Sequence, residues 1–101
     1  INNTNLVDEN ILIDDFKILS VYPNPFNPIA NIEYSIGQES NLSINIYDIN
    51  GREIEKLFEG YKDSGSYSLS WNASEQATGV YFIKFKVNNT SPIVHRLVLI
   101  K

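Results

Sequence analysis

Cysteine is absent from the 101 residues, and histidine occurs only once, as His95. Without cysteine, no disulfide can hold the fold together, and a cysteine-based zinc site is excluded. A single imidazole does not make a zinc centre, and no serine stands in the kind of nucleophile motif that would give a catalytic histidine its partner. We therefore expect His95 to be a strand residue that points to solvent.

The sequence also lacks a basic block and a long apolar run. Its 8 basic residues are outnumbered by 12 acidic residues, which gives a net charge of −4 and argues against a nucleic-acid-binding surface. No stretch of 18 apolar residues exists, and the N-terminal segment lacks the basic and apolar regions of a signal peptide. If the parent protein is exported, we expect its leader to lie elsewhere. The length fits one small domain with one core.

Two regions of different composition divide the chain. Residues 1–15 mix asparagines with Asp8, Glu9, Asp14 and Asp15, and only the "ILI" of residues 11–13 offers apolar surface. Such a composition is typical of a linker or a loosely docked arm. From residue 16 onward, short apolar or alternating runs are separated by turn residues. We therefore expect a linker over residues 1–15 and a folded domain over residues 16–101.

Seven short runs in this domain have the composition and spacing of β-strands. No cysteine pair of the antibody kind joins them. Seven strands on a chain of this length predict an all-β fold, a seven-stranded immunoglobulin-like β-sandwich of two antiparallel sheets. The predicted strands span residues 17–21, 31–36, 42–47, 52–58, 66–71, 79–87 and 93–100.

Alternation within the runs predicts which side chains face the core. One residue in two is apolar in most of the runs, as expected for strands with one buried face. The "REIEKLFEG" stretch also has apolar residues at helical spacing, but its place after the Asn50–Gly51 turn favours a strand paired with the preceding one. The expected core side chains are Ile32, Tyr34, Ile36, Leu42, Ile44, Ile46, Tyr67, Leu69, Trp71, Tyr81, Ile83, Phe85 and Val87.

The "YPNPFNP" stretch of residues 22–28 holds three prolines in seven residues. Each proline removes a backbone donor and biases the preceding residue toward extended geometry, so this stretch forms neither a helix nor the middle of a sheet. We expect a rigid crossover between two strands, with Phe26 as the apolar side chain that anchors it. The aromatic residue before Pro23 makes the Tyr22–Pro23 bond a candidate for the cis form.

Two further patterns carry a chemical alternative. "DINGRE" places Asp48, Asn50 and Glu53 in one turn, as in a cation-binding loop. The distal acidic ligands of a calcium loop are missing, so a hairpin turn is the favoured interpretation. Four tyrosines could form a sugar-stacking platform or simply line the edge of the core. These tyrosines are Tyr47, Tyr61, Tyr67 and Tyr81. A small sandwich rarely has a cleft for paired catalytic carboxylates, so we do not expect an enzyme.

Taken in order, five blocks resemble the C-terminal sorting domain of the type IX, or Por, secretion system, in its type A form. The resemblance runs over residues 16–101. Ala30 and His95 depart from the residues usual in the family, which leaves open how basic the tail must be. The blocks are "YPNPFNP" (22–28), "IEYSI" (32–36), "LSINIYDINGREI" (42–54), "GSYSLSWNASEQATGVYF" (65–82) and "RLVLIK" (96–101).

The resemblance implies a role in export. Members of this family are tails of secreted or surface proteins of Bacteroidetes and related phyla. It implies that the passenger reaches the periplasm and that the outer-membrane translocon recognises the folded tail. A sortase-like peptidase would then cut within residues 1–15 and attach the passenger to the cell surface. It implies no cofactor, small-molecule substrate or nucleic acid.

Family motif positions are carried over residue by residue. We expect the translocon to read the last strand and tail by strand addition at an exposed edge, with the proline stretch supporting the sheet. The expected recognition residues are Leu97, Val98, Leu99, Ile100 and Lys101. The expected structural positions are Pro23, Asn24, Pro25, Phe26, Asn27, Pro28, Gly51, Arg52, Glu53, Gly65, Tyr67, Trp71, Gly79, Val80 and Tyr81.

Two other functions remain open on the residues alone. A carbohydrate-binding sandwich beside a catalytic domain would use the tyrosine platform. An immunoglobulin-like domain of the flagellar hook-cap type shares parts of the same strand motifs.

Overall fold

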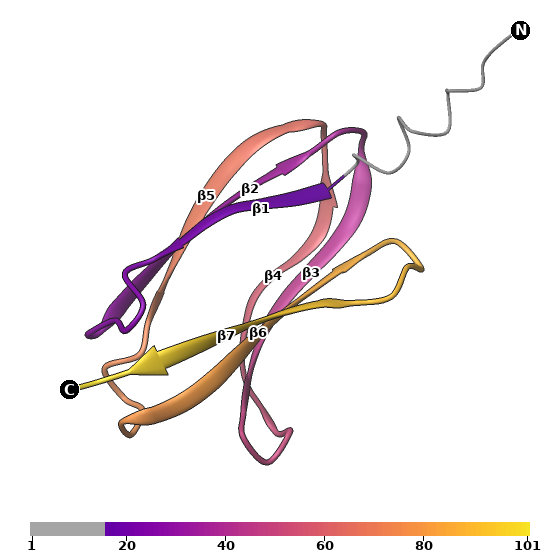
Figure 1. Cartoon of the computed structure of the whole chain (residues 1–101). Helices are drawn as coiled ribbons and strands as arrows, with labels where there is room; N and C mark the ends of the chain where they lie inside the picture. Colours follow the sequence, from indigo (N-terminus) through magenta and orange to yellow (C-terminus); the bar gives the residue numbers. More distant parts are fainter. Residues whose placement is uncertain (1–15) are drawn as a thin grey trace, which may run out of the picture.

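The computed structural model describes residues 16–101, so the predicted linker over residues 1–15 lies outside the described part. Seven strands follow one another along this part of the chain, as predicted (Figure 1). Within these residues, no helix has the length and apolar character that a membrane span requires. The strands are β1 Phe16–Tyr22, β2 Ile29–Ile36, β3 Ser40–Asp48, β4 Glu53–Lys62, β5 Gly65–Asn72, β6 Gly79–Val87 and β7 Ile93–Leu99.

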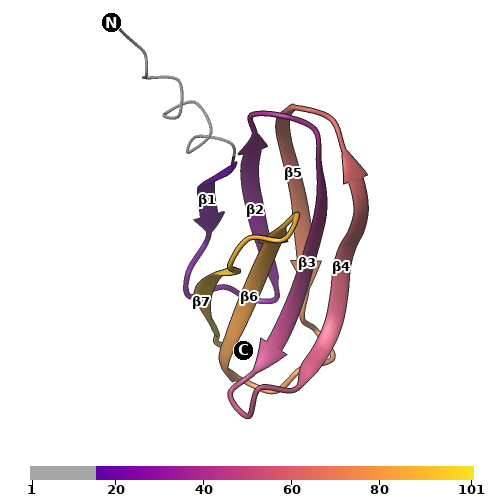
Figure 2. The same ribbon diagram turned by 90° about the vertical axis from the view of Figure 1, so that its right-hand side faces the viewer.

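The strands form two antiparallel sheets that face each other (Figure 2). One sheet has the order β1-β2-β5 and the other the order β4-β3-β6-β7. This arrangement confirms the predicted two-sheet sandwich. In an immunoglobulin constant domain the fourth strand belongs to the sheet of the first two. Here β4 instead pairs with β3 in the four-stranded sheet.

The core lies between the sheets and is built from the predicted strand faces. Ile32 of the three-stranded sheet is fully buried, as are Ile44, Ile83 and Phe85 of the facing four-stranded sheet. Trp71 is fully buried as well, and its indole Nε1 donates a hydrogen bond of 2.9 Å to Glu55 Oε1. The indole nitrogen therefore keeps a polar partner although the ring has left water.

Two β-bulges explain why β4 has apolar residues at helical spacing. Ile44 pairs with Phe58 but Asn45 pairs with Lys56, and a second shift follows between Ile46 and Tyr47. Each shift inserts one extra residue into β4, which interrupts the strict alternation of a strand. The extra residues are Leu57 and Ile54, and both pack against the core. The prediction of a strand is confirmed, and β4 continues four residues beyond its predicted end.

The turn between β3 and β4 is held by Asp48. Its Oδ1 accepts hydrogen bonds from the backbone N–H groups of Asn50 (2.9 Å) and Arg52 (3.0 Å). Gly51 has φ of +82°, and its N–H donates to Asp48 O at 3.0 Å. These features match a three-residue hairpin loop with a glycine in the left-handed region. The predicted pairing is thus confirmed, and Gly51 alone supplies the positive φ.

The same hydrogen bonds lower the pKa of the Asp48 carboxyl. The largest cause is the N–H of Arg52, and the N–H of Asn50 and the guanidinium of Arg52 add to it. Arg52 Nε donates to Asp48 Oδ2 at 3.2 Å. Because the Arg52 side chain is exposed, solvent screens much of its interaction with the Asp48 carboxylate.

Truncation of a core aromatic should cost much stability. Phe85→Ala removes a buried ring that packs on Phe16 and Tyr34, and we expect a loss of about 3–5 kcal/mol in the free energy of unfolding. Urea denaturation of the full chain measures this loss. Leu19→Ala, at a side chain that is 52% exposed, is the control and should change stability by less than about 0.5 kcal/mol. Equal effects of the two variants would contradict the described core.

Acidification should loosen the β3–β4 turn. The folded pKa of Asp48 lies below the unfolded value, so its contribution is present above the unfolded pKa and is lost as pH falls through the folded pKa. NMR titration of the Asn50 and Arg52 amide protons should show both shifting together in this acidic range. Asp48→Asn keeps an acceptor oxygen but does not titrate, so in this variant the shared transition should be absent.

Candidate functional site

The proline segment, residues 22–28, connects β1 to β2, which are antiparallel neighbours in one sheet. The prediction of a crossover between two strands was wrong in this respect, because the segment is the connection of a hairpin. It nevertheless reaches the last strand of the other sheet. The peptide bonds before its three prolines, Pro23, Pro25 and Pro28, are cis, including the predicted Tyr22–Pro23 bond.

Phe26 links the proline segment to β7 through its backbone. The N–H of Phe26 donates to Val98 O at 2.9 Å, and the N–H of Ile100 donates to Phe26 O at 3.1 Å. These bonds form a short parallel bridge with Leu99 at its centre. The segment therefore acts as a fragment of an additional strand at the outer edge of the four-stranded sheet.

The side chain of Phe26 anchors this bridge in the core. It is 1% exposed, and its ring lies on Trp71 with 5.4 Å between ring centroids. Burial of a phenylalanine side chain contributes about 2 kcal/mol or more. The predicted role of Phe26 as an apolar anchor is confirmed.

Asn24 extends the same contact, because its side-chain carboxamide takes the place of a backbone peptide group as hydrogen-bond donor and acceptor. Its Nδ2 donates to Arg96 O at 3.2 Å, and its Oδ1 accepts from the N–H of Val98 at 3.0 Å. The carboxamide thus gives β7 one donor and one acceptor in ladder positions, where proline nitrogens have no hydrogen to give. We call the contacts of Asn24 and Phe26 with residues 96–100 the edge seal.

The five predicted recognition residues occupy different environments. Leu97 and Leu99 are fully buried in the core, whereas Val98 is half-buried and Ile100 is 50% exposed. Lys101 is exposed. Its N–H donates to Thr78 Oγ1 at 3.2 Å and its Nζ donates to Ser74 O at 2.7 Å. The end of the described chain is therefore tied to the β5–β6 connection.

Other expected structural positions gather at the same end of the sandwich. Trp71 meets the ring of Tyr81 edge-on, with 5.4 Å between centroids, and the hydroxyl of Tyr81 donates to Ala77 O. Gly79 and Val80 pair with Leu99 and Val98 in the β6–β7 ladder. The structure thus brings the proline segment, Trp71 and the β6–β7 ladder together around one end of β7. Gly65 and Tyr67 lie on β5 instead, where Tyr67 stacks on Tyr34.

Neither of the two chemical alternatives, the cation loop and the tyrosine platform, forms among the described residues. Both carboxylate oxygens of Asp48 are engaged by the turn, and residues 16–101 contain no cluster of three potential metal ligands. Tyr67 and Tyr81 lie on inner strand faces beside Tyr34 and Trp71. Tyr47 and Tyr61 pair with Glu53 and Asn41, at opposite ends of the β3–β4 ladder. The four rings therefore share no flat surface.

His95 is half-buried and does not point straight into solvent as predicted. Because side chains alternate along a strand, His95 shares the inner face of β7 with buried Leu97 and Leu99. It lies nearer the start of β7, where Ile93 on the same face is already 41% exposed. The thinning of the core toward this end explains its intermediate exposure.

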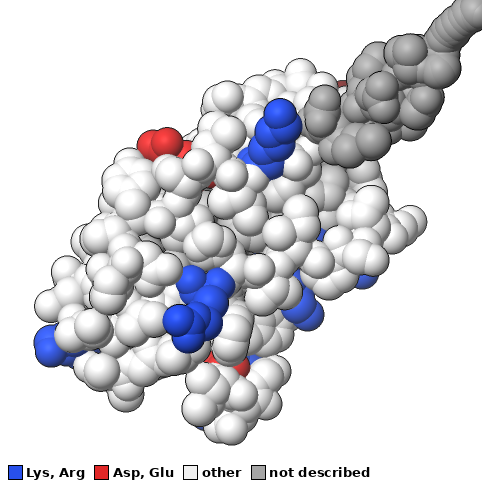
Figure 3. All heavy atoms as spheres, viewed as in Figure 1, with Lys and Arg blue, Asp and Glu red and all other residues white. Residues whose placement is uncertain are grey.

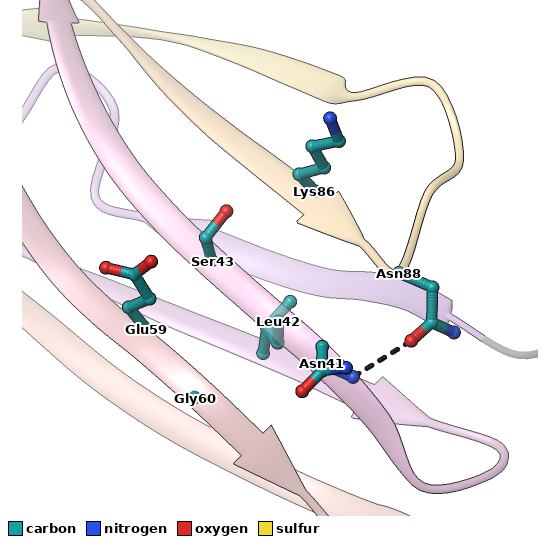
Figure 4. A pocket seen from close by; sticks show the side chains of 7 residues that line it. All are labelled: Asn41, Leu42, Ser43, Glu59, Gly60, Lys86 and Asn88. Carbon is teal, nitrogen blue, oxygen red and sulfur yellow. Dashed lines mark hydrogen bonds between the residues drawn. The ribbon is translucent and has the colours of Figure 1, made fainter.

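Two grooves on the outer face of the four-stranded sheet were not predicted. One is polar and lies between β3, β4 and β6, where Gly60 has no side chain to fill it and Asn88 Oδ1 accepts from the N–H of Asn41 at 3.0 Å (Figure 4). The other, which we call the apolar groove, has a volume of about 250 Å³ and is lined by Tyr47, Asp48, Ile49, Gly51, Phe82, Lys84 and Val94. Finding either groove required the strand order, which local patterns do not give.

Removal of the Asn24 carboxamide should loosen the edge seal. Asn24→Ala leaves Arg96 O and Val98 N–H without these partners, and we expect a loss of about 1–2 kcal/mol in the free energy of unfolding, with faster exchange of the Val98 amide. Asn27→Ala is a matched control, since Asn27 also precedes a proline and is exposed. Thermal unfolding and amide exchange by NMR measure both effects. Equal behaviour of the two variants would show that the carboxamide does not support β7.

The comparisons with known proteins agree with the fold. Among solved structures, the crystal structure of dimeric latent PorU from Porphyromonas gingivalis is similar, with a TM-score of 0.64 and 15% sequence identity. The match covers 84% of this chain and 9% of the PorU chain, so this chain spans a small part of that protein. At this identity the likeness shows the fold alone. No curated protein sequence matches the chain significantly.

A family model gives the assignment that the structure alone does not. The model described as "Secretion system C-terminal sorting domain" matches residues 20–101, from β1 through the proline segment to the last residue of the sequence. It thus covers the edge seal, both sheets and the tail. The chain belongs to the C-terminal sorting domains of the Por, or type IX, secretion system, a family of non-catalytic signal domains that direct secretion.

Proposed function

We propose that this chain is the export tail of a larger passenger protein and that the outer-membrane translocon of the type IX system recognises it in the periplasm as a folded unit. The observation that carries this proposal is the edge seal. Four hydrogen bonds from Asn24 and Phe26 hold residues 96–100 in one conformation at the sheet edge. A segment held in this way is pre-organised, so a partner that binds it loses little conformational freedom.

Within the tail, we infer that some residues contact the partner directly and that others support the fold. Val98, Ile100 and Lys101 are accessible and are the recognition residues that a partner can touch directly. Leu97 and Leu99 act through folding, because their side chains are buried in the core. We therefore retain the five predicted recognition residues and propose that Leu97 and Leu99 act indirectly.

We further propose that the passenger is released by a cut within residues 1–15. A sortase-like peptidase makes this cut and attaches the passenger to the cell surface, or frees it outside the cell. This proposal is supported by the polar and acidic composition of this stretch, which precedes the first strand of the domain. The tail itself needs no cofactor, nucleic acid or small-molecule substrate for this role.

A fused reporter tests the export role. The full chain is placed behind a reporter with a periplasmic leader in a host that has the translocon, and reporter is measured in the medium and in the periplasm. Export should be lost without residues 97–101. That deletion also removes core side chains, so the sharper variant is Ile100→Asp with Lys101→Ala, which should lower export by about tenfold while the domain stays folded.

The matched control carries the same two changes elsewhere. Leu19 is 52% exposed on β1, and Lys56 is exposed on β4, so Leu19→Asp with Lys56→Ala should be exported normally. Circular dichroism and melting temperature check the fold of each variant. If the tail variant folds and is exported like the control, direct reading of Ile100 and Lys101 is wrong. If the unaltered chain is not exported, the export role itself is wrong.

A further inference from the structure

One half of the outer edge of β7 has no strand beside it. β7 pairs with β6 along its inner edge, and the edge seal covers Arg96 O, both backbone groups of Val98 and Ile100 N–H. In an antiparallel strand, N–H and C=O of one residue point to the same edge, and successive residues alternate. The N–H and C=O of Val94 and the N–H of Arg96 therefore also point outward. We call these three groups the open edge; no ladder in the described chain includes them.

The apolar groove begins directly beside the open edge. Val94 lines it from β7 and is 55% exposed, and Phe82 and Tyr47 continue it across β6 and β3. Ile49, which is 69% exposed, closes it at the β3–β4 turn. Unpaired backbone groups next to exposed apolar side chains are the features that an added strand requires, since the backbone gives affinity and the side-chain pockets give specificity.

Basic side chains predominate around this region, although Asp48 lines the groove and Glu53 accepts a hydrogen bond from the Tyr47 hydroxyl. From residue 76 onward the sequence contains no aspartate or glutamate, but it contains Lys84, Lys86, Arg96 and Lys101. Lys84 lines the groove, with its Nζ 4.6 Å from the centroid of the Tyr47 ring. Asp48 also lines it, but Arg52 is paired with its carboxylate. The face that carries β7 shows more basic than acidic side chains (Figure 3).

We propose that the open edge and the apolar groove bind one extended strand of a partner protein, with apolar side chains in the groove and acidic side chains near Lys84 and Arg96. This inference rests on the proposed function, because the partner is a component of the export machinery. The added strand pairs with residues 94–96 at the start of β7. The outward backbone groups from Arg96 O onward are already hydrogen-bonded in the edge seal. The tail residues then lie next to the added strand.

A second copy of this chain is the less favourable occupant. Antiparallel pairing of two β7 edges would bring Arg96 and Lys84 of both copies close together, and like charges across a strand pair are destabilising. An acidic strand meets the same groups with opposite charge. Complementary charges also speed the encounter of the two partners.

The edge is tested by a substitution that removes one outward donor. Val94→Pro deletes the N–H that faces away from β6, and proline is tolerated at such an edge position. Val94→Thr is the matched control, because it keeps the N–H and the β-branched shape. In the reporter assay, Val94→Pro should lower export by about tenfold with an unchanged fold, and Val94→Thr should not.

The charge is tested separately and does not depend on the backbone change. Lys84→Glu should also lower export by about tenfold. Lys17→Glu, the same change at an exposed residue of β1, should leave export unchanged. If Val94→Pro fails to fold, the two lysine variants test the proposal, and equal export of both overturns it.

The outcomes separate the two proposals. Absence of export for the unaltered chain refutes the proposed function. Full export of a folded Val94→Pro variant refutes strand addition and leaves the export role standing. Amide exchange of the free full chain should be fast at Val94 and Arg96 and slow at Val98 and Ile100; protection of Val94 overturns the open edge. A dimer in analytical ultracentrifugation that Val94→Pro abolishes assigns the edge to a second copy and also overturns the proposal.

Discussion

The sandwich depends on the contact between the proline segment and β7. This contact joins the two sheets of a chain that has no cysteine and therefore no disulfide. Asn24 and Arg96 are 72 residues apart in the sequence, and Phe26 fills the space over Trp71 between the sheets. Contacts of such high sequence separation form only after long loops have closed, which costs conformational entropy. The buried ring and the four hydrogen bonds of the edge seal offset this cost.

Strand positions and core faces could be predicted because they depend on local alternation. Ile32, Tyr34 and Trp71 are buried where the period of two placed them. The bulges in β4 could not be predicted, since Leu57 enters the core only because one residue of β3 faces two of β4. Prediction was thus accurate at these positions, where one strand alone decides the orientation of a side chain.

The candidate site was harder to predict because it is made by neighbours distant in sequence. Asn24 was expected to be structural, but its contact with Arg96 O and Val98 N–H needs knowledge of which strand lies beside the prolines. His95 is different, because alternation with Leu97 and Leu99 on its own strand places it on the inner face and the prediction missed this local signal. Sequence patterns indicated a structural role for Asn24 and left its partners undetermined.

Interdependence of the first connection and the last strand gives the domain a means of quality control. A chain that stops short of β7, through early termination or proteolysis, leaves the backbone of Phe26 and the carboxamide of Asn24 without partners and uncovers the core under Leu97 and Leu99. Such a product has an incomplete apolar layer and is prone to proteolysis or aggregation. Truncation before β7 would thereby remove the sorting signal and the fold of this domain together.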